Sequence, residues 1–254
     1  LSPPARCWIA PNGSHGPLDI SGAIEHSCNY FFYEVGYRLS RNNGVYDSDT
    51  GLEKLAYYAD QFGLSDKSGV EISESAPKVS DFDAIRSAIG QGTNNYSTVG
   101  LARYVTTVAN SGNCYNLSLL SKATDADGNL IADYTPTLRN TVDLKQSTWD
   151  AIHQGMRKVV EDKDYYKDLT IQVAGKTGTA QENRKRANHA LFVCYAPYEQ
   201  PQIAIATRIA FGYASDYAAQ VTKDIVKYYF KLEDESSLIT GTAESTNVVQ
   251  SAGD

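Results

Sequence analysis

The chain has 254 residues, of which 42% are hydrophobic and 21% are charged, and its formal net charge is −7. This composition is ordinary for a globular protein, and the length is sufficient to bury a sizeable core. The acidic balance, without a Lys/Arg stripe interleaved with aromatic residues, argues against nucleic-acid binding. No stretch of the sequence approaches the ~20 apolar residues of a membrane-spanning helix.

The first predicted elements are two helices between Asp19 and Leu39, because apolar residues recur there at helical spacing. The short-side-chain cluster His26-Ser27-Cys28-Asn29 interrupts this pattern, so we expect one helix to give way to another at the cluster.

Two further helices follow in the first half of the chain. In "TGLEKLAYYADQFG", Thr50 is a plausible N-cap, Glu53 completes a capping box, and Gly63 follows the end. In "STVGLARYVTTVANSG", Ser97 starts a helix that is expected to end near Gly112.

The second half is predicted to contain strands between helices. Residues 118–134 are typical of a hairpin around Asp127-Gly128, and "STWDAIHQGMRKVVED" is an amphipathic helix. Strand-like runs at 171–178, 188–196 and 202–210 precede the helical "DYAAQVTKDIVKYYF". Short links favour antiparallel pairing, so we predict an α+β fold with an antiparallel sheet flanked by helices.

Two smaller features complete the description. Residues 233–254 are rich in Ser, Thr and acidic residues, so we expect a flexible tail. The four cysteines are too few for a disulfide scaffold and lack the Cys-x-x-Cys spacing of a zinc site, so we expect buried free thiols and no metal or cofactor. They are Cys7, Cys28, Cys114 and Cys194.

The run "IQVAGKTGTAQE" breaks from apolar residues into a cation, two threonines and two glycines. Such a strand margin suits an extended peptide with an anionic end: Lys176, Thr177 and Thr179 would hold its carboxylate, and Gly178 would give its backbone clearance. The alternative is a glycine-containing turn with a solvated lysine.

A second polar pair lies upstream at the expected helix joint. Ser27 and Asn29 supply a hydroxyl and a carboxamide that could face the strand across a cleft, although Asn29 alone would also suit a helix cap. Penicillin-recognising enzymes combine a Ser-x-Asn type motif with Lys-Thr-Gly in this order.

On these motifs, the chain resembles the transpeptidase domain of class B penicillin-binding proteins, of the penicillin-binding protein 2 type. The resemblance runs from Cys7 to about Leu232 and includes "HGPLDISGAIEHSCNYFFYEVG", "AIGQGTNNYSTVGLARYVTTVANSG" and "NHALFVCYAP". It implies the penicillin-recognising fold, with residues 1–232 as the C-terminal portion of the domain.

The resemblance also implies an activity and residue roles. In the family a serine is acylated by peptidoglycan stem peptides ending in D-Ala-D-Ala and passes the acyl group to a neighbouring strand's amine, and β-lactams imitate that peptide. Ser27 matches the serine that relays protons, and Asn29 the residue that orients the substrate amide. Lys176 and Thr177 match the carboxylate and proton-network groups, and Thr179 lies where a backbone N–H joins the oxyanion hole.

The family's nucleophile is missing from this sequence. Its Ser-x-x-Lys motif precedes the Ser-x-Asn motif, but the residues before Ser27 contain no such pattern. The one occurrence, Ser75 to Lys78, lies on the wrong side, and Pro77 disfavours the helical turn that would bring its ends together. We therefore expect the nucleophile to be supplied outside this chain, by a missing N-terminal portion or a second chain, and the chain alone to be inactive; a natural protein that has lost catalysis is the alternative.

Three functions follow as hypotheses. The first is a D,D-transpeptidase on the extracytoplasmic face of the bacterial membrane, anchored through an N-terminal segment not in this chain. The others are a β-lactamase or carboxypeptidase, and a β-lactam-sensing or non-catalytic penicillin-binding domain. An incomplete sheet would also leave an unpaired edge, so the chain is expected to be stable only with its N-terminal portion or by self-association.

Overall fold

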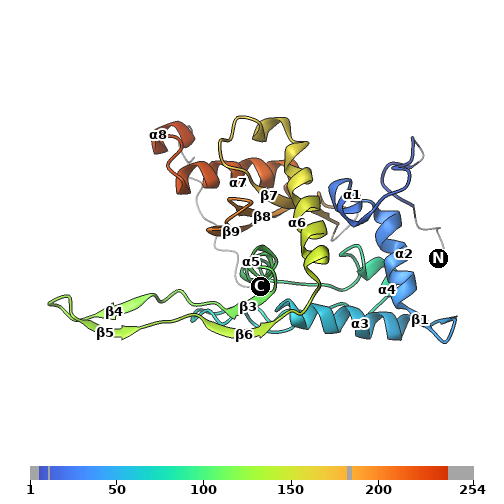
Figure 1. Ribbon diagram of the computed structural model, residues 1–254, viewed down its shortest axis with the longest axis horizontal. Coiled ribbons are helices and arrows are strands. Elements are labelled where there is room, and N and C mark those ends of the chain that lie inside the picture. The colour runs from blue at the N-terminus through green and yellow to red at the C-terminus, as the bar shows by residue number, and fades with distance from the viewer. Residues whose placement is uncertain (1–5, 11, 182–184, 240–254) are drawn as a thin grey trace.

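The computed structural model describes residues 6–10, 12–181 and 185–239 (Figure 1). The helices are α1 (Ile20–Glu25), α2 (Asn29–Leu39), α3 (Ser48–Gln61), α4 (Ala84–Ser87), α5 (Thr98–Ala109), α6 (Gln146–Glu161), the 3₁₀ turn η1 (Asp164–Tyr166), α7 (Ser215–Tyr229) and α8 (Glu235–Leu238). The strands are β1 (Arg41–Asn42), β2 (Val45–Tyr46), β3 (Asn113–Asn116), β4 (Lys122–Thr124), β5 (Leu130–Asp133), β6 (Thr137–Thr141), β7 (Ala174–Ala180), β8 (His189–Ala196) and β9 (Ile203–Ile209).

The main sheet has the order β7-β8-β9, and both strand pairs are antiparallel. The central strand β8 buries both faces, which explains its nearly continuous apolar sequence. Ala190, Phe192 and Cys194 point into one core cluster, while Val193 and Tyr195 alternate into a second one. The prediction of an α+β fold with an antiparallel sheet is confirmed.

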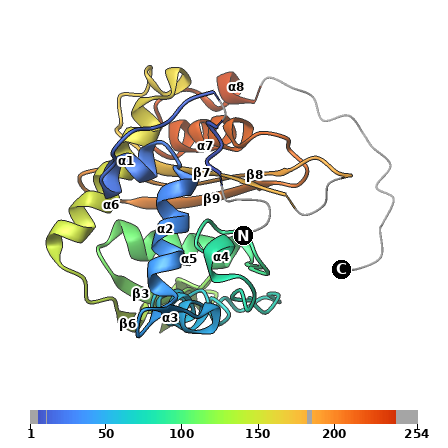
Figure 2. The ribbon, with the colours of Figure 1, turned by 90° about the vertical axis from the view of Figure 1, so that its right-hand side faces the viewer.

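Helices cover both faces of this sheet (Figure 2). Helix α7 packs on β8 and β9, with Ala218, Ala219 and Val226 fully buried. Helix α5 packs against β9 and β8 from the other side, and α6 contacts β7 and α1. The sheet is therefore the middle layer, and α1 reaches the β7 end of it through α6.

The helix starts and stops follow local capping chemistry. The predicted joint between α1 and α2 is confirmed, and Ser97 caps α5 by accepting a hydrogen bond from the Gly100 N–H at 3.0 Å. The predicted N-cap Thr50 is wrong. Asp47 caps α3, accepting from the Asp49 N–H at 3.0 Å and the Thr50 hydroxyl at 2.6 Å, so the helix starts before Thr50.

Residues 118–134 form the predicted hairpin, with β4 and β5 paired antiparallel around Asp125 to Asn129. The hairpin projects from the body as a long arm (Figure 1). At its base β3 pairs with β6, an association that the sequence pattern did not predict because both strands are short and polar.

The structure corrects the position of the strand predicted at 171–178, which is β7. Strand β7 starts at Ala174, not at 171, because the backbone of the preceding segment bonds elsewhere: Gln172 O accepts from the Tyr198 N–H at 2.9 Å and Val173 O from Arg157 at 3.0 Å. Lys176 to Thr179 therefore lie inside the strand, not at its end.

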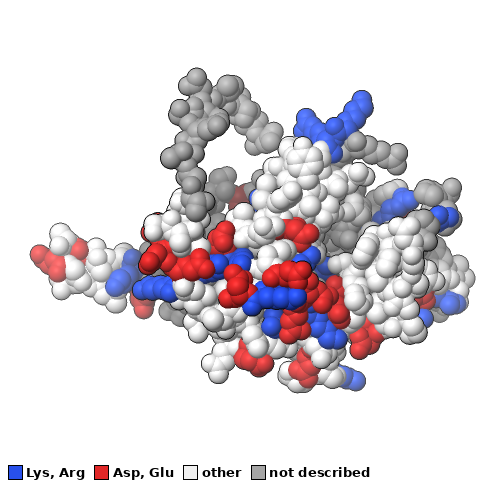
Figure 3. Space-filling view, turned by 90° about the horizontal axis from the view of Figure 1, so that it is seen from above, with Lys and Arg blue, Asp and Glu red and all other residues white. Residues whose placement is uncertain are grey.

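Charged side chains of both signs are interspersed over the described part of the face in Figure 3. Ion pairs tie α7 to the segment before β7, with Lys163 and Asp216 at 2.7 Å and Lys223 and Asp168 at 2.6 Å. In the described ranges, every helix is too short or too polar to cross a bilayer. The expected flexible tail at 233–254 begins with α8, and residues 240–254 of that prediction lie outside the described residues.

Candidate active site

Ser27 occupies the tight joint between α1 and α2. Its N–H donates to Ile24 O at 3.2 Å, the Cys28 N–H donates to Ala23 O at 3.0 Å, and Ser27 has a left-handed φ of 48°. These bonds form a Schellman motif, which ends one helix with a left-handed residue and turns the chain sharply. The turn projects the Ser27 hydroxyl from the corner instead of burying it in a helix face.

Lys176 reaches this corner from the sheet. Its ammonium donates hydrogen bonds to Ser27 Oγ and, at 3.2 Å, to the backbone carbonyl of Thr177. The structure thus brings together Ser27 and Lys176, 149 residues apart in the chain.

The electrostatic surroundings of Lys176 favour its neutral form. Burial, and to a lesser extent the nearby positive charge of Lys163, lowers its pKa from 10.5 to about 8. A lysine with a pKa near 8 can both hold and release a proton at neutral to mildly alkaline pH. The influence of Lys163 was missed from sequence, where nothing marks it as a neighbour of Lys176.

Strand β7 is an edge of the sheet among the described residues, since β8 pairs with it on one side only. Thr177 and Thr179 share one face of this edge strand, so their hydroxyls lie two residues apart along it. Thr179 is exposed and Thr177 partly buried. An edge of this kind can accept an extended peptide as a further strand.

Two glycines of β7 have different reasons to be glycine. A Cβ at Gly175 would lie 2.5 Å from the Phe192 ring and 2.9 Å from Val193 O, so packing alone requires glycine there. A Cβ at Gly178 would meet only Leu191 Cβ at 3.4 Å. Internal packing therefore does not account for Gly178, and the position leaves room for a ligand backbone.

Asn29 is the first residue of α2, one position after the residue that caps the helix. The alternative assignment of Asn29 as the helix N-cap is wrong, because Cys28 occupies that position. Asn29 is partly buried and follows the Ser27 corner directly, so the joint carries both members of the Ser-x-Asn motif.

The remaining Ser-x-x-Lys sequence is part of a different structure. Lys78 forms an isolated antiparallel bridge with Asn95, and its ammonium pairs with Asp81 at 3.1 Å. This extended backbone does not provide the helical turn that stacks residues three apart, in agreement with the expectation for Ser75 to Lys78.

An apolar cavity of about 410 Å³ lies beside Lys176. Its wall is assembled from α1, α2, α3, α5, α6, β7 and β8, and its side chains include Ile24, Phe32, Phe62, Tyr104, Met156 and Val193. Lys176 contributes positive charge to this otherwise largely apolar wall. Sequence reasoning did not predict the cavity, because its lining comes from seven separate elements.

Comparison with known proteins identifies relatives of this chain. The family model described as "Penicillin binding protein transpeptidase domain" matches residues 3–227. The peptidoglycan D,D-transpeptidase MrdA of Haemophilus influenzae is 27% identical over 270 residues, covering 87% of this chain and 39% of the relative. The chain thus spans about two fifths of the length of that relative.

Solved structures give the same picture for the fold. Penicillin-binding protein 2B of Streptococcus pneumoniae superposes with a TM-score of 0.77 at 24% identity, covering 89% of this chain and 41% of the other. Penicillin-binding protein A of Mycobacterium tuberculosis, solved as an imipenem acyl-enzyme complex, superposes with a TM-score of 0.74 at 21% identity, covering 87% and 49%.

Proposed function

The chain belongs to the penicillin-binding protein transpeptidase domain family, and on this premise we propose that it forms the peptide-binding part of a peptidoglycan D,D-transpeptidase. The observation that carries the proposal is the hydrogen bond from the Lys176 ammonium to Ser27 Oγ, made at the edge of a sheet and beside an apolar cavity.

The Ser27–Lys176 pair is suited to moving one proton. When the nucleophilic serine attacks D-Ala-D-Ala, an ester bond to the serine forms and the amide bond to the terminal D-Ala breaks. The departing D-Ala amine must then gain a proton. Ser27 donates its hydroxyl proton to that amine and accepts a proton from the Lys176 ammonium. The lowered pKa of Lys176, about 8, makes this transfer less costly than it would be from an ordinary lysine.

The edge of β7 is suited to holding the peptide. The substrate lies along the strand as an added β-strand, with its terminal carboxylate bound by the hydroxyls of Thr177 and Thr179 and attracted by Lys176. Gly178 lets the substrate backbone approach, and Asn29 orients its amide. The Thr179 N–H contributes to the oxyanion hole, where one donor is typically worth about 3 kcal/mol.

The acylated serine comes from a segment outside this chain. The cavity beside Lys176 supports this assignment, because its wall is apolar and could pack a further helix that brings a serine and a base to the Ser27 corner. The greater length of the H. influenzae relative leaves ample sequence for such a segment. The domain then works on the extracytoplasmic face of the membrane, where peptidoglycan is found.

Labelling with a fluorescent penicillin tests the proposal in the longer protein that carries this chain. The wild type should form a lasting covalent adduct, and Lys176→Ala should slow adduct formation by at least about a hundredfold, the scale of a lost acid–base catalyst. Lys122→Ala, an exposed lysine on the β4–β5 hairpin, is the matched control and should label normally.

Each other result has a definite meaning. Rapid loss of the adduct would indicate a β-lactamase or carboxypeptidase instead. A lasting adduct without cross-linking of donor and acceptor peptides would indicate a sensor. Normal labelling of Lys176→Ala would contradict the role given to the Ser27–Lys176 pair.

A further inference from the structure

Helix α6 lies between the two elements that bring the site together (Figure 1). It packs against α1 on one side and against β7 on the other. Helix α1 ends two residues before Ser27, and β7 carries Lys176. The proton transfer proposed above involves no side chain of α6, yet the packing of α6 on both sides bears on the distance between the two groups that exchange the proton.

Gly155 brings the backbone of α6 against α1. It is buried within the helix, and a Cβ at this position would lie 2.8 Å from Ile24 Cβ and 2.9 Å from Ser21 O, closer than packed atoms approach one another. Glycine weakens a helix interior relative to alanine, so a glycine here needs a reason in packing. The close approach of α1 supplies that reason.

Polar contacts hold α1 on the same side of α6. The buried Ser21 hydroxyl shares a hydrogen bond between Ala151 O at 2.9 Å and Gln154 Oε1 at 3.1 Å. The Lys158 ammonium lies 3.5 Å from the Glu25 carboxylate. Close packing and directed contacts together therefore fix α1 on α6.

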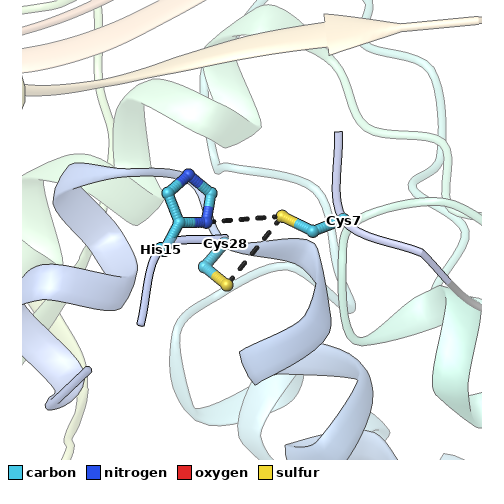
Figure 4. Close-up of side chains that lie close together, drawn as sticks. All are labelled: Cys7, His15 and Cys28. Atoms are coloured by element: carbon cyan, nitrogen blue, oxygen red, sulfur yellow. Dashed lines mark hydrogen bonds between the residues drawn. The ribbon is translucent and has the colours of Figure 1, made fainter. Parts of the chain in front are cut away.

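Ser27 is fixed to α1 in turn. Its N–H donates to the carbonyl of Ile24, the residue that a side chain at Gly155 would displace, at 3.2 Å. The next residue, Cys28, lies 3.9 Å from the sulfur of Cys7, so the segment before α1 packs on this joint as well (Figure 4). A displacement of α1 from α6 is therefore carried to the Ser27 hydroxyl.

Arg157 ties the other side of α6 to the strand that carries Lys176. Its guanidinium, 20% exposed, donates to Val173 O at 3.0 Å, directly before β7 begins at Ala174. Glu161, one turn further along α6, lies 3.3 Å from the same guanidinium and orients it. The start of β7 is thereby fixed relative to α6.

We propose that α6 is a spacer that sets the contact between Ser27 and Lys176, with Gly155 as the positioning residue toward α1 and Arg157 as the positioning residue toward β7. The absence of a side chain at Gly155 lets α1 approach until the Ser27 hydroxyl is within hydrogen-bond reach of the Lys176 ammonium. Separation matters for the chemistry, because a misplacement of about 1 Å can cost about a hundredfold in rate. The kinetic consequence rests on the proposed function, whereas the geometric role of α6 does not.

Penicillin labelling of the longer protein that carries this chain tests Gly155. Gly155→Ala should force α1 away from α6 and lower the first-order acylation rate at saturating penicillin about tenfold, with the penicillin concentration at half-maximal rate unchanged. Gly51→Ala is the matched control. Its Cβ would lie 2.8 Å from Ala84 Cβ, so it disturbs buried packing between α3 and α4, outside the connection from α1 through α6 to β7, and should acylate like the wild type.

Two substitutions test Arg157. Arg157→Met keeps the length of the side chain but removes the donor to Val173 O, and it should slow acylation severalfold. Arg157→Lys keeps a donor and should recover most of the wild-type rate. Equal rates for the methionine and lysine variants would contradict a positioning role through this hydrogen bond.

A double-mutant cycle tests the spacing without any acylation. In denaturant unfolding of the longer protein, Ser27→Ala and Lys176→Met should be coupled, because the two side chains share a hydrogen bond. The coupling should be lost in the Gly155→Ala background and kept in the Gly51→Ala background. If Gly155→Ala does not fold, Arg157→Met provides the background in its place.

Coupling that persists in both the Gly155→Ala and Arg157→Met backgrounds would overturn the proposal, as would equal slowing of acylation by Gly155→Ala and Gly51→Ala. A wild type that takes up no penicillin would contradict the proposed function, and the cycle would still decide whether α6 sets the contact.

Discussion

At the scale of single residues, Lys176 combines the strongest electrostatic signal of the site with its central contact. The side chain reaches Ser27 while packing on the wall of an apolar cavity, so it carries charge where water is scarce. Lysine tolerates such a place because it can give up its proton, which arginine cannot. Because burial lowers the pKa of Lys176 to about 8, the residue gives up its proton more readily than an ordinary lysine does.

The lowered pKa of Lys176 makes the stability of the fold depend on pH. The pKa of Lys176 is lowered in the folded state, so between about pH 8 and pH 10.5 the unfolded chain binds the proton more readily than the folded one. Stability therefore rises with pH across this window, and the cost of burying the charge, up to about 3 kcal/mol, is fully present below pH 8.

Lys176→Met should accordingly be more stable than the wild type at pH 7, and the advantage should shrink toward pH 10.5. Denaturant unfolding at a series of pH values measures the difference, with Lys122→Met as the exposed control. An advantage that stayed constant from pH 7 to pH 10 would contradict a buried, titrating Lys176.

At the scale of elements, the α1–α2 joint places a functional side chain by using an unfavourable backbone conformation. A left-handed residue at this Schellman position is normally glycine, and a serine there costs about 1 kcal/mol. The chain keeps the serine, which indicates that the hydroxyl matters more than the local stability.

Substitution of Ser27 should separate these two effects. Ser27→Gly and Ser27→Ala both remove the hydroxyl and should slow penicillin labelling equally, but the glycine variant should be more stable than the alanine variant by about 1 kcal/mol. Thermal unfolding and labelling rates of the longer protein measure the two effects.

Asn43, also left-handed with a φ of 48°, provides the control, since it lies exposed in the turn between β1 and β2. Asn43→Gly and Asn43→Ala should differ in stability without changing labelling. Equal stability of the two Ser27 variants would refute the strained-joint explanation.

At the scale of the whole molecule, the apolar pocket beside Lys176 and the edges of the sheet are surfaces that a further segment could cover. The apolar pocket of about 410 Å³ leaves its largely apolar wall without a packing partner, and apolar surface left uncovered contributes neither burial nor van der Waals contacts to stability. Both β7 and β9 are also edge strands among the described residues. A further segment that packs into the pocket would cover this apolar wall.

The chain by itself should therefore unfold in a broad transition at low temperature, or associate with itself, and the longer protein should melt cooperatively at a higher temperature. Calorimetry combined with sedimentation, to monitor oligomeric state, makes the comparison. A sharp, cooperative transition of the isolated monomer would show that the cavity is filled or tolerated without another segment.

The sequence predicted the elements whose signals are local. Amphipathic periodicity predicted α6 and α7, strand-like runs predicted β8 and β9, and capping residues predicted the start of α5 and the end of α3. Local signals failed where two neighbouring residues could both cap, as with Thr50 and Asp47, and where tertiary hydrogen bonds replaced strand pairing before Ala174. The motif order also led to the family, because several short motifs in register are far more specific than one.

The tertiary structure alone decided which side chains meet. The motifs placed Ser27 and Lys176 in one site only through the family resemblance, and their contact, like the cavity wall, joins residues whose separation along the chain carries no local signal. Their proximity depends on how α1 packs against α6 and how α6 packs against β7. Periodicity and capping act over a few residues and fix the elements, whereas the packing of those elements fixes the chemistry, since hydrogen bonds require atoms to be about 3 Å apart.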